Sequence, residues 1–284
     1  MIVTFESDVD RIIADRQHGS SWLVAEMIRA CRSLRGDPQA TGRLRDAFGR
    51  FRAIDRSMAV VHHFLDALEP TLGGDFFGAL EVYEHYWSRV PERVVQTLTD
   101  QLDTGPVRLL THSHSQVVID ALVGLLESGV DLSVWQTESH PGGEGRAALK
   151  ELRRHGIEAE LVPDRPTDHD LADVTALVLG MDQYTAEAFV NKVGSAGLVA
   201  ALRALGKPVY VLGDPRKRVC RLGYSDALFE TVPWQPGVML VTGEGMASAT
   251  RGWPRDRLME IVRPATAPRQ APGPRADRSR VRAG

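Results

Sequence analysis

The sequence predicts an α/β protein with an N-terminal helical domain, residues 1–103, followed by a Rossmann-like, doubly wound parallel sheet domain, residues 104–262. Two observations lead to this fold class. The first hundred or so residues carry apolar side chains at helical spacing. Beyond them, short apolar runs alternate with helical segments, and repeated strand–helix–strand units build a parallel sheet with helices on its faces.

The helical domain is expected to be a bundle of segments separated by clear breaks. In the second segment Leu23, Met27 and Cys31 fall on one helical face, and Pro91 stands in the first turn of the last segment, where proline is favoured. The predicted helices are Phe5–Arg16, Trp22–Leu34, Thr41–Arg52, Ser57–Leu68, Phe76–Trp87 and Pro91–Asp103. We interpret this array as a packing and oligomerisation domain.

In the second domain, strand-like and helical runs alternate along the chain. The predicted strands are Val107–Thr111, Leu132–Thr137, Ala159–Val162, Ala176–Leu179, Val209–Leu212 and Val238–Thr242. The helical runs between them are Gln116–Leu126, Gly145–His155, Asp168–Asp173 and Asn191–Leu205. Gly129, Gly156 and Gly206 stand just past three of these helices, where a left-handed C-terminal cap is expected.

The last segment, residues 263–284, predicts a disordered basic tail. It contains four prolines and six arginines against one acid, and it lacks apolar anchors. We interpret this tail as a solvated terminal extension and assign it no function.

The composition limits the class of partner. Hydrophobic residues make up 43% of the 284 residues and charged residues 25%, as in a soluble globular protein with a sizeable core. A net charge of −3 gives no electrostatic basis for nucleic acid as the main partner. Cys31 and Cys220 cannot build a disulfide framework, and no export signal or membrane-spanning run is apparent, so a cytoplasmic location is expected.

Polar residues gather at the end of the first predicted strand. Thr111-His112-Ser113-His114-Ser115 follows an apolar run and precedes a helix. The carboxyl ends of parallel strands form the ligand-binding edge of such sheets, where hydroxyls and helix amides can bind a phosphate. N-capping of the next helix by Ser113 or Ser115 is the alternative, and it needs no ligand.

A second polar turn follows the next predicted strand. The segment Thr137–Arg146 contains a proline and three glycines, which allow a tight turn, and it places Arg146 in the first turn of a helix. A cation there is unfavourable against the helix dipole unless it meets an anion, so Arg146 is a candidate phosphate-binding residue. An ordinary salt bridge with Glu138 or Glu144 is the alternative.

Two further candidates follow later strands. Asp182 is a carboxylate at a strand's carboxyl end, which suits a general acid or base, although a helix cap is the alternative. The segment Asn191-Lys192-Val193-Gly194-Ser195 is expected to open a helix, where a lysine is favoured only if it faces a bound anion or enolate. A solvated lysine is the alternative.

Weaker candidates lie outside these turns. Gly19 precedes the second helix and offers amides to an anion, with an N-cap as the alternative, and Arg56 precedes another helix, where a surface role is the alternative. The basic run Asp214–Arg218 follows a strand, and we expect it to be solvated.

Three motifs together resemble those of one family: Thr111-His112-x-x-Ser115, Thr137-Glu138-Ser139-x-Pro141-x-x-x-Gly145-Arg146 and Asn191-Lys192-x-Gly194. The family comprises the alpha, beta and delta subunits of translation initiation factor 2B, ribose-1,5-bisphosphate isomerase and methylthioribose-1-phosphate isomerase. The resemblance runs from about Asp10 to Gly245. It implies the two domains predicted above, assembly into homodimers or higher homo-oligomers, and no metal or nicotinamide cofactor.

The resemblance also implies a set of site residues. The isomerases of the family convert a cyclic aldose 1-phosphate to the open ketose phosphate, and their catalytic cysteine and aspartate correspond to Ser113 and Asp182. Their substrate-binding positions correspond to Gly19, Arg56, Ser115, Arg146, Asn191 and Lys192.

Three positions depart from the isomerase pattern. Ser113 replaces the cysteine, and residues 17–20 read Gln-His-Gly-Ser in place of an arginine-glycine phosphate motif. The interval from Asp182 to Asn191 is one residue shorter than usual.

Two functional hypotheses follow. The first is an aldose–ketose isomerase for a pentose 1-phosphate of the ribose-1,5-bisphosphate or methylthioribose-1-phosphate type, because Asp182 supplies an acid/base group and Asn191, Lys192 and Arg146 supply partners for oxyanions. The second is a non-catalytic module, similar to factor 2B, that binds a protein partner or a phosphorylated small molecule, either a sugar or a nucleotide derivative. Ser113 and the altered region around Gly19 favour this second hypothesis.

Overall fold

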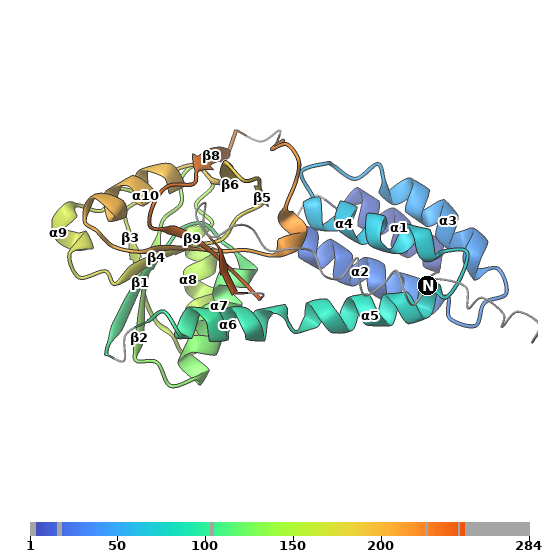
Figure 1. Cartoon of the computed structure of the whole chain (residues 1–284), viewed down its shortest axis with the longest axis horizontal. Helices are drawn as coiled ribbons and strands as arrows, with labels where there is room; N and C mark the ends of the chain where they lie inside the picture. Colours follow the sequence, from blue (N-terminus) through green and yellow to red (C-terminus); the bar gives the residue numbers. More distant parts are fainter. Residues whose placement is uncertain (1–3, 16–18, 103–104, 225–226, 244, 248–284) are drawn as a thin grey trace, which may run out of the picture.

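The computed structural model describes residues 4–15, 19–102, 105–224, 227–243 and 245–247. The molecule is elongated, with a helical bundle at one end and α/β layers at the other (Figure 1). The predicted fold class is confirmed. The predicted tail, residues 263–284, lies outside the described residues, and the domain boundary near residue 103 stays a prediction.

Six α-helices precede the first strand among the described residues, as the sequence predicts. They are α1 Phe5–Ala14, α2 Ser20–Ser33, α3 Ala40–Phe51, α4 Ala59–Leu68, α5 Phe76–Ser88 and α6 Val90–Thr99, with a short 3-10 helix η1 at Glu69–Thr71. Aromatic rings fill the bundle: the Phe48 ring lies 5.7 Å from that of Phe64, and the Phe64 ring meets Tyr83 edge-on at 5.3 Å.

The central sheet has seven strands among the described residues. They are β1 Val107–Thr111, β2 Leu132–Thr137, β3 Glu158–Val162, β4 Ala176–Leu179, β7 Val209–Leu212, β9 Val238–Thr242 and β10 Gly245–Ala247. Their order is β10-β9-β7-β4-β1-β2-β3, and all neighbours are parallel except β10 and β9. Five of the predicted strands have the observed bounds, because a buried parallel strand is an uninterrupted apolar run.

Helices cover both faces of this sheet, which confirms the doubly wound arrangement. They include α7 Gln116–Glu127, α8 Gly145–Arg154, α9 Asp168–Leu171 and α10 Ser195–Ala204. On one face α6 packs against α7 and β9, and on the other α10 packs against β4 and β7. Side chains along a strand alternate between the two cores, as Leu109 and Leu110 do in β1. The predicted left-handed caps are confirmed at Gly129, Gly156 and Gly206.

One predicted helix begins too early. The sequence predicts a helix over Asn191–Leu205, but the first two of these residues end a strand, β6 Ala188–Lys192, and α10 begins at Ser195. β6 pairs antiparallel with β5 Gln183–Tyr184 and with β8 Phe229–Pro233 in a separate three-stranded sheet. Because β8 lies far along the chain, local spacing does not reveal this pairing.

The order of the central sheet reverses beside β1. From β1 the chain passes outwards to β2 and β3, and then crosses back to β4 on the other side of β1. In open α/β sheets, the loops after two strands that flank such a reversal diverge, and ligands bind between them. The turns after β1 and β4 are therefore where a ligand site is expected.

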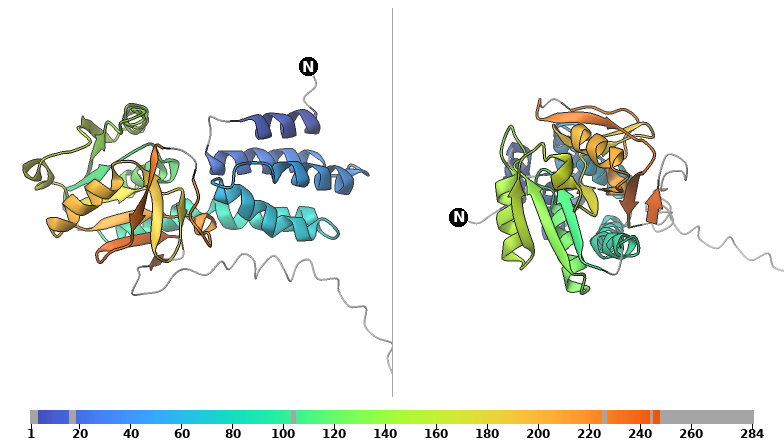
Figure 2. Two further views of the ribbon diagram at one scale, coloured as in Figure 1. Left: turned by 90° about the horizontal axis from the view of Figure 1, so that it is seen from above. Right: turned by 90° about the vertical axis from the view of Figure 1, so that its left-hand side faces the viewer.

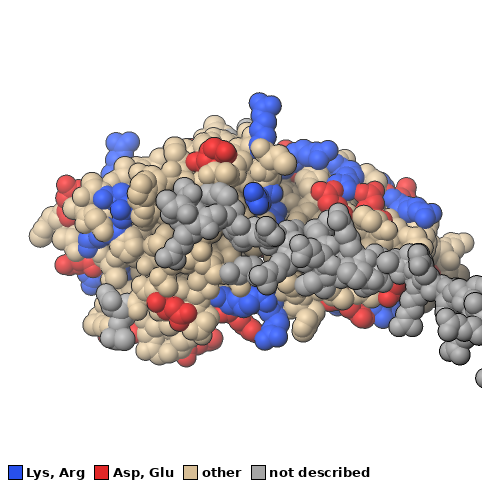
Figure 3. Space-filling model, in the orientation of Figure 1, with Lys and Arg blue, Asp and Glu red and all other residues tan. Residues whose placement is uncertain are grey.

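No helix among the described residues is both long enough and apolar enough to span a bilayer. On the face that Figure 3 shows, acidic and basic side chains are interspersed outside the grey atoms. Nucleic acids instead require a continuous basic patch or stripe.

Candidate functional site at the strand ends

The turn after β1 is held by buried hydroxyl and imidazole groups. His112 contacts Thr137 Oγ1 through Nδ1 at 2.6 Å and the Val193 carbonyl oxygen through Nε2 at 2.9 Å. A carbonyl can only accept, so Nε2 donates and Nδ1 accepts from the Thr137 hydroxyl. Burial lowers the pKa of His112 and favours the neutral imidazole that this arrangement needs.

A second set of bonds fixes the backbone at Ser113. Its amide donates to Ser139 Oγ at 2.8 Å, and the Asp164 carboxylate accepts from the amides of Ser139 and His140 at 2.5 and 2.8 Å. Ser113 and Ser139 take left-handed conformations, with φ of 70° and 65°. Such conformations are uncommon for residues other than glycine and persist only when the surroundings hold them.

One carboxylate joins Ser113 to Lys192. The Ser113 hydroxyl donates to Glu144 Oε1 at 3.1 Å, and Lys192 Nζ lies 2.9 Å from Oε1 and 3.2 Å from Oε2. Lys192 Nζ also donates to the Pro141 carbonyl oxygen. Because the Lys192 side chain is only 2% exposed, the alternative of a solvated lysine is wrong.

Asp182 follows β4 and lies close to the turn after β1. The two turns touch at Gly180, where an added Cβ would lie 2.2 Å from Ser115 Oγ, so no larger residue fits without a shift. Ser115 is the N-cap residue of α7, but its side chain makes no capping bond within the described chain. The capping alternative therefore does not account for the Ser115 hydroxyl.

The Asp182 carboxyl is exposed to solvent, although protein surrounds it on many sides. Desolvation by this protein raises the pKa of Asp182, while Lys217 opposes the rise. The Lys217 ammonium donates to the carbonyl oxygen of Met181 at 2.5 Å, one residue before Asp182. A raised pKa and an accessible carboxyl are the properties that a general acid or base needs near neutral pH.

Asn191 lies in β6, next to the residue that Asp182 contacts. The Asp182 amide donates to the Val190 carbonyl oxygen at 2.9 Å, and Val190 directly precedes Asn191. Asn191 Nδ2 donates to Ser195 Oγ at 3.1 Å, and the Ser195 hydroxyl donates to the Lys192 carbonyl oxygen at 2.6 Å. These bonds hold the end of β6 in place beside Asp182.

The loop before α4 brings the helical bundle to this edge. Gln183 Nε2 donates to the carbonyl oxygens of Arg56 and Ser57 at 3.4 and 3.2 Å, and Gln183 Oε1 accepts from the Gly223 amide at 2.9 Å. Gln183 directly follows Asp182, so the loop that carries the exposed Arg56 contacts the residue next to Asp182.

Arg146 and Gly19 are less closely tied to these groups. Arg146 lies in the first turn of α8, as predicted, but its guanidinium donates to Glu138 Oε1 at 2.9 Å, which is the salt-bridge alternative. Gly19 is the N-cap residue of α2 and has open space beside it. α2 begins at the end of the bundle that faces the α/β layers (Figure 2).

The basic run after β7 is mostly not solvated, contrary to the prediction, and only Arg218 among its basic residues is exposed. In the 3-10 helix η2, Pro215–Lys217, Arg216 forms an ion pair with Asp214, and the two side chains are only 10% and 11% exposed. The Arg216 guanidinium also lies 4.4 Å from the ring centroid of Trp87 in α5. Only the tertiary structure brings this run against the bundle.

Sequence reasoning missed three residues of the site. Glu144 was considered only as a salt-bridge partner of Arg146, although it stands in a glycine-rich turn that was already a candidate. Lys217 was assigned to the solvent, and Gln183 carries no signal in the sequence beyond its place next to Asp182.

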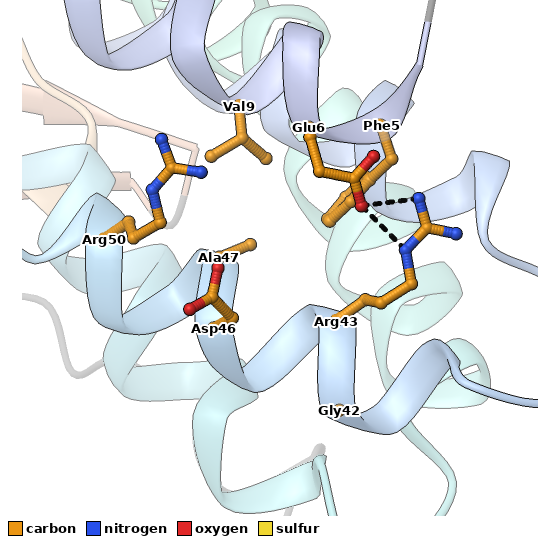
Figure 4. Close-up of a pocket in the computed structure, with 8 residues that line it drawn as sticks. All are labelled: Phe5, Glu6, Val9, Gly42, Arg43, Asp46, Ala47 and Arg50. Carbon is orange, nitrogen blue, oxygen red and sulfur yellow. Dashed lines mark hydrogen bonds and ion pairs between the residues drawn. The ribbon is translucent and has the colours of Figure 1, made fainter.

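A separate pocket lies within the bundle, between α1 and α3 (Figure 4). Its volume is about 270 Å³. Its arginines are already paired, Arg43 with Glu6 and Asp37, and Arg50 with Asp10. Its volume is below the range of about 300–1,000 Å³ that is typical of ligand pockets. The strand ends are therefore the better candidate site.

The strand ends combine the groups that proton transfer on a small anion requires. Two carboxyl groups, Asp182 and Glu144, lie at these turns, the charge of Lys217 acts on Asp182, and the backbone carbonyl of Arg56 accepts from the neighbouring Gln183. No group of three or more His, Cys, Asp or Glu residues suited to a metal ion occurs in the part of the chain that the structure describes.

The chain is similar to proteins of known sequence over its central part. The Initiation factor 2 subunit family matches residues 84–227. Translation initiation factor eIF2B subunit alpha of Caenorhabditis elegans is 30% identical over 117 residues, which are 41% of this chain and 38% of that protein. Ribose 1,5-bisphosphate isomerase of Archaeoglobus fulgidus is 26% identical over 132 residues, 46% of this chain and 42% of that enzyme. The chain thus spans about two fifths of the length of these relatives.

The similarity to solved structures extends over most of the fold. The crystal structure of the Pyrococcus horikoshii translation initiation factor eIF-2B superposes with a TM-score of 0.71 and covers 87% of this chain and 98% of that one. The sequence identity is 21%, so this match supports the fold alone.

Proposed function

The chain belongs to the Initiation factor 2 subunit family, as its motifs predict, and on this basis we propose that it isomerises a phosphorylated pentose from aldose to ketose. The observation that carries the proposal is Asp182. Its carboxyl is exposed, has a raised pKa, and follows β4 beside the reversal of the sheet. Relatives in the family include ribose 1,5-bisphosphate isomerase, so the proposed substrate is a pentose 1-phosphate of that type or of the methylthioribose 1-phosphate type.

The proposed chemistry needs two kinds of group at the same edge. Opening a cyclic aldose 1-phosphate and moving a proton from C2 to C1 requires an acid/base group, for which Asp182 is suited. The phosphate requires cations, and we assign this role to Lys217, whose charge acts on Asp182, and to Arg56, whose loop contacts Gln183. Ser113 stands at the second catalytic position of the family's isomerases, and its hydroxyl contacts Glu144.

The test is proton NMR of the protein with ribose 1,5-bisphosphate and with methylthioribose 1-phosphate in deuterated water. Wild type should give the signals of the ketose phosphate. Asp182→Asn should lower kcat by about 10²–10⁴-fold, since general acid/base groups contribute that much, while substrate binding is retained. Asp131→Asn, an exposed aspartate in the loop before β2, is the matched control and should match wild type. Full activity of Asp182→Asn would contradict the role of Asp182.

The second candidate is a non-catalytic module that binds a phosphorylated metabolite or a protein partner. Ser113 favours it, because a serine hydroxyl is a far weaker acid than a cysteine thiol with a pKa of about 8.5. This candidate predicts no ketose with either sugar, together with ligand line-broadening that Arg56→Ala reduces. Recovery of a stoichiometric partner protein with the wild-type chain would support it further.

A further inference from the structure

We propose that Glu144 is the base that takes the proton from C2 of the sugar, and that Ser113 is a positioning residue that holds the Glu144 carboxylate. The inference rests on the isomerase activity proposed above. Proton transfer at carbon then needs a second catalytic group beside Asp182. We assign this role to the Glu144 carboxylate and not to the Ser113 hydroxyl that contacts it.

The contacts of Ser113 favour a holding role. Its backbone is fixed in the left-handed region by the bond from its amide to Ser139 Oγ, and its hydroxyl donates to Glu144 Oε1 at 3.1 Å. A hydroxyl that donates to a carboxylate orients it but has little basicity of its own. A glutamate is a carboxylate at neutral pH and is an effective base for a proton next to a carbonyl-type carbon.

Lys192 holds the same carboxylate from the other side. An ammonium has three donors, and those of Lys192 face the Pro141 carbonyl oxygen and the two oxygens of Glu144. Lys192 is therefore fully engaged as the counter-ion of Glu144. The two side chains also differ in exposure. The Lys192 side chain is 2% exposed, and the Glu144 side chain is 28% exposed. A ligand at the strand ends can reach the carboxylate but not the ammonium.

Gly142 keeps the space around this pair open. It has a φ of 112°, and a Cβ there would lie 2.6 Å from Glu144 Oε2 and 3.1 Å from Lys192 Nζ. A larger residue would force the carboxylate away from both of its partners. The glycine-rich turn thus accommodates the Glu144–Lys192 pair.

The proton balance needs no further reactant. Asp182 in its protonated form gives a proton to the ring oxygen, and the bond from this oxygen to C1 breaks. Glu144 then removes the C2 proton, and the electron pair of that bond forms the C1–C2 double bond of an enol phosphate. The C2 hydroxyl returns its proton to Asp182 as the C2 carbonyl forms, and Glu144 delivers its proton to C1. The product is the ketose phosphate, and both carboxyl groups regain their starting states.

Steady-state kinetics of three variants test the assignment. Glu144→Gln should lower kcat by about 10²–10⁴-fold with KM little changed, because a positioned base contributes that much. Ser113→Ala should lower kcat by less than about tenfold, since it removes one hydrogen bond of about 1 kcal/mol. Glu151→Gln is the matched control. Glu151 lies in α8, the helix whose N-cap residue is Glu144, and its carboxylate contacts His114 Nε2 at 3.0 Å, so this variant should match wild type.

Chemical rescue separates a catalytic loss from a structural one. Formate should restore turnover to Glu144→Ala, because it supplies a small carboxylate to the vacated position, and it should not restore Asp182→Asn. If Glu144→Gln keeps wild-type kcat, or if Ser113→Ala is as damaging as Glu144→Gln and formate rescues nothing, the role of Glu144 is wrong while the isomerase remains. Absence of turnover by wild type on both sugars would instead overturn the proposed function itself, and the role of Glu144 with it.

Discussion

At the scale of single residues, the candidate site places two carboxyl groups in different surroundings. Glu144 contacts an ammonium at 2.9 Å and a hydroxyl at 3.1 Å. Asp182 is desolvated by the protein around it, and its pKa is raised. A carboxyl with a raised pKa is suited to donate a proton, and a carboxylate oriented by an ammonium and a hydroxyl is positioned to accept one. The two carboxyl groups thus differ in their expected roles because of the groups around them, and not because one is a glutamate and the other an aspartate.

The raised pKa of Asp182 predicts how the stability of the chain depends on pH. Between the ordinary aspartate value and the raised value, the folded chain binds more protons than the unfolded chain, so stability falls as the pH rises through this window. Asp182→Asn removes the charge, and it should therefore raise the melting temperature at pH 7. The gain should shrink as the pH falls through this window, because the wild-type carboxyl then becomes protonated in the folded chain.

Thermal unfolding followed by circular dichroism between pH 4 and pH 7 measures this gain. Asp131→Asn, in an exposed loop, should leave the melting temperature unchanged throughout. A melting temperature of Asp182→Asn that is lower than that of wild type at pH 7 would show that the carboxylate stabilises the fold.

At the scale of elements, η2 connects the sheet to the bundle through a buried ion pair. Burial alone would raise the pKa of Asp214, but Arg216 outweighs it and the pKa is lowered. The Arg216 guanidinium also lies 4.4 Å from the ring centroid of Trp87, which is a cation–π distance. The next residue, Lys217, bonds to Met181, so η2 couples the bundle to the turn that presents Asp182.

Removing one partner of this pair should destabilise the chain strongly. Arg216→Met leaves Asp214 as a buried charge without its counter-ion, which costs about 3–5 kcal/mol. The double variant Asp214→Asn/Arg216→Met should lose much less, because no uncompensated charge remains. Urea unfolding of the three proteins gives these free energies, and a double variant at least as unstable as Arg216→Met would contradict this account.

At the scale of the whole molecule, one hydrophobic core runs through both parts of the chain. The cluster that contains Phe48 and Phe64 of the bundle also contains Leu109 of β1 and Leu122 of α7. A second cluster under α10 fills the other face of the sheet. The bundle and one face of the sheet are therefore packed as a continuous unit, and we expect them to unfold together.

Phe48→Ala tests this coupling from the bundle side. Phe48 is fully buried, so the truncation should destabilise the chain by about 3–5 kcal/mol. The loss should appear equally in a probe of the bundle and in one of the sheet, such as hydrogen exchange of the β1 and β4 amides. If the β4 amides keep wild-type protection while the bundle loosens, the two parts unfold separately.

Much of the fold was predictable from local pattern, and less of the site was. The bounds of β1, β2 and β4 follow from their apolar runs. The helix predicted from Asn191 was wrong at its start, because β6 is stabilised by β8, which local periodicity does not reveal. The solvation of Arg216 was wrong for the same kind of reason, since its partner Trp87 belongs to a distant helix.

By itself, the sequence determined which segments become strands and helices and which turns carry hydroxyls, carboxylates and cations, because these depend on residue type and short-range spacing. Only the tertiary structure decided which of these groups meet. Ser113 and Glu144 are 31 positions apart in the chain, and Glu144 and Lys192 are 48 apart. Their contact depends on the order of the strands and on the crossings between them, and these are set by packing across the whole sheet.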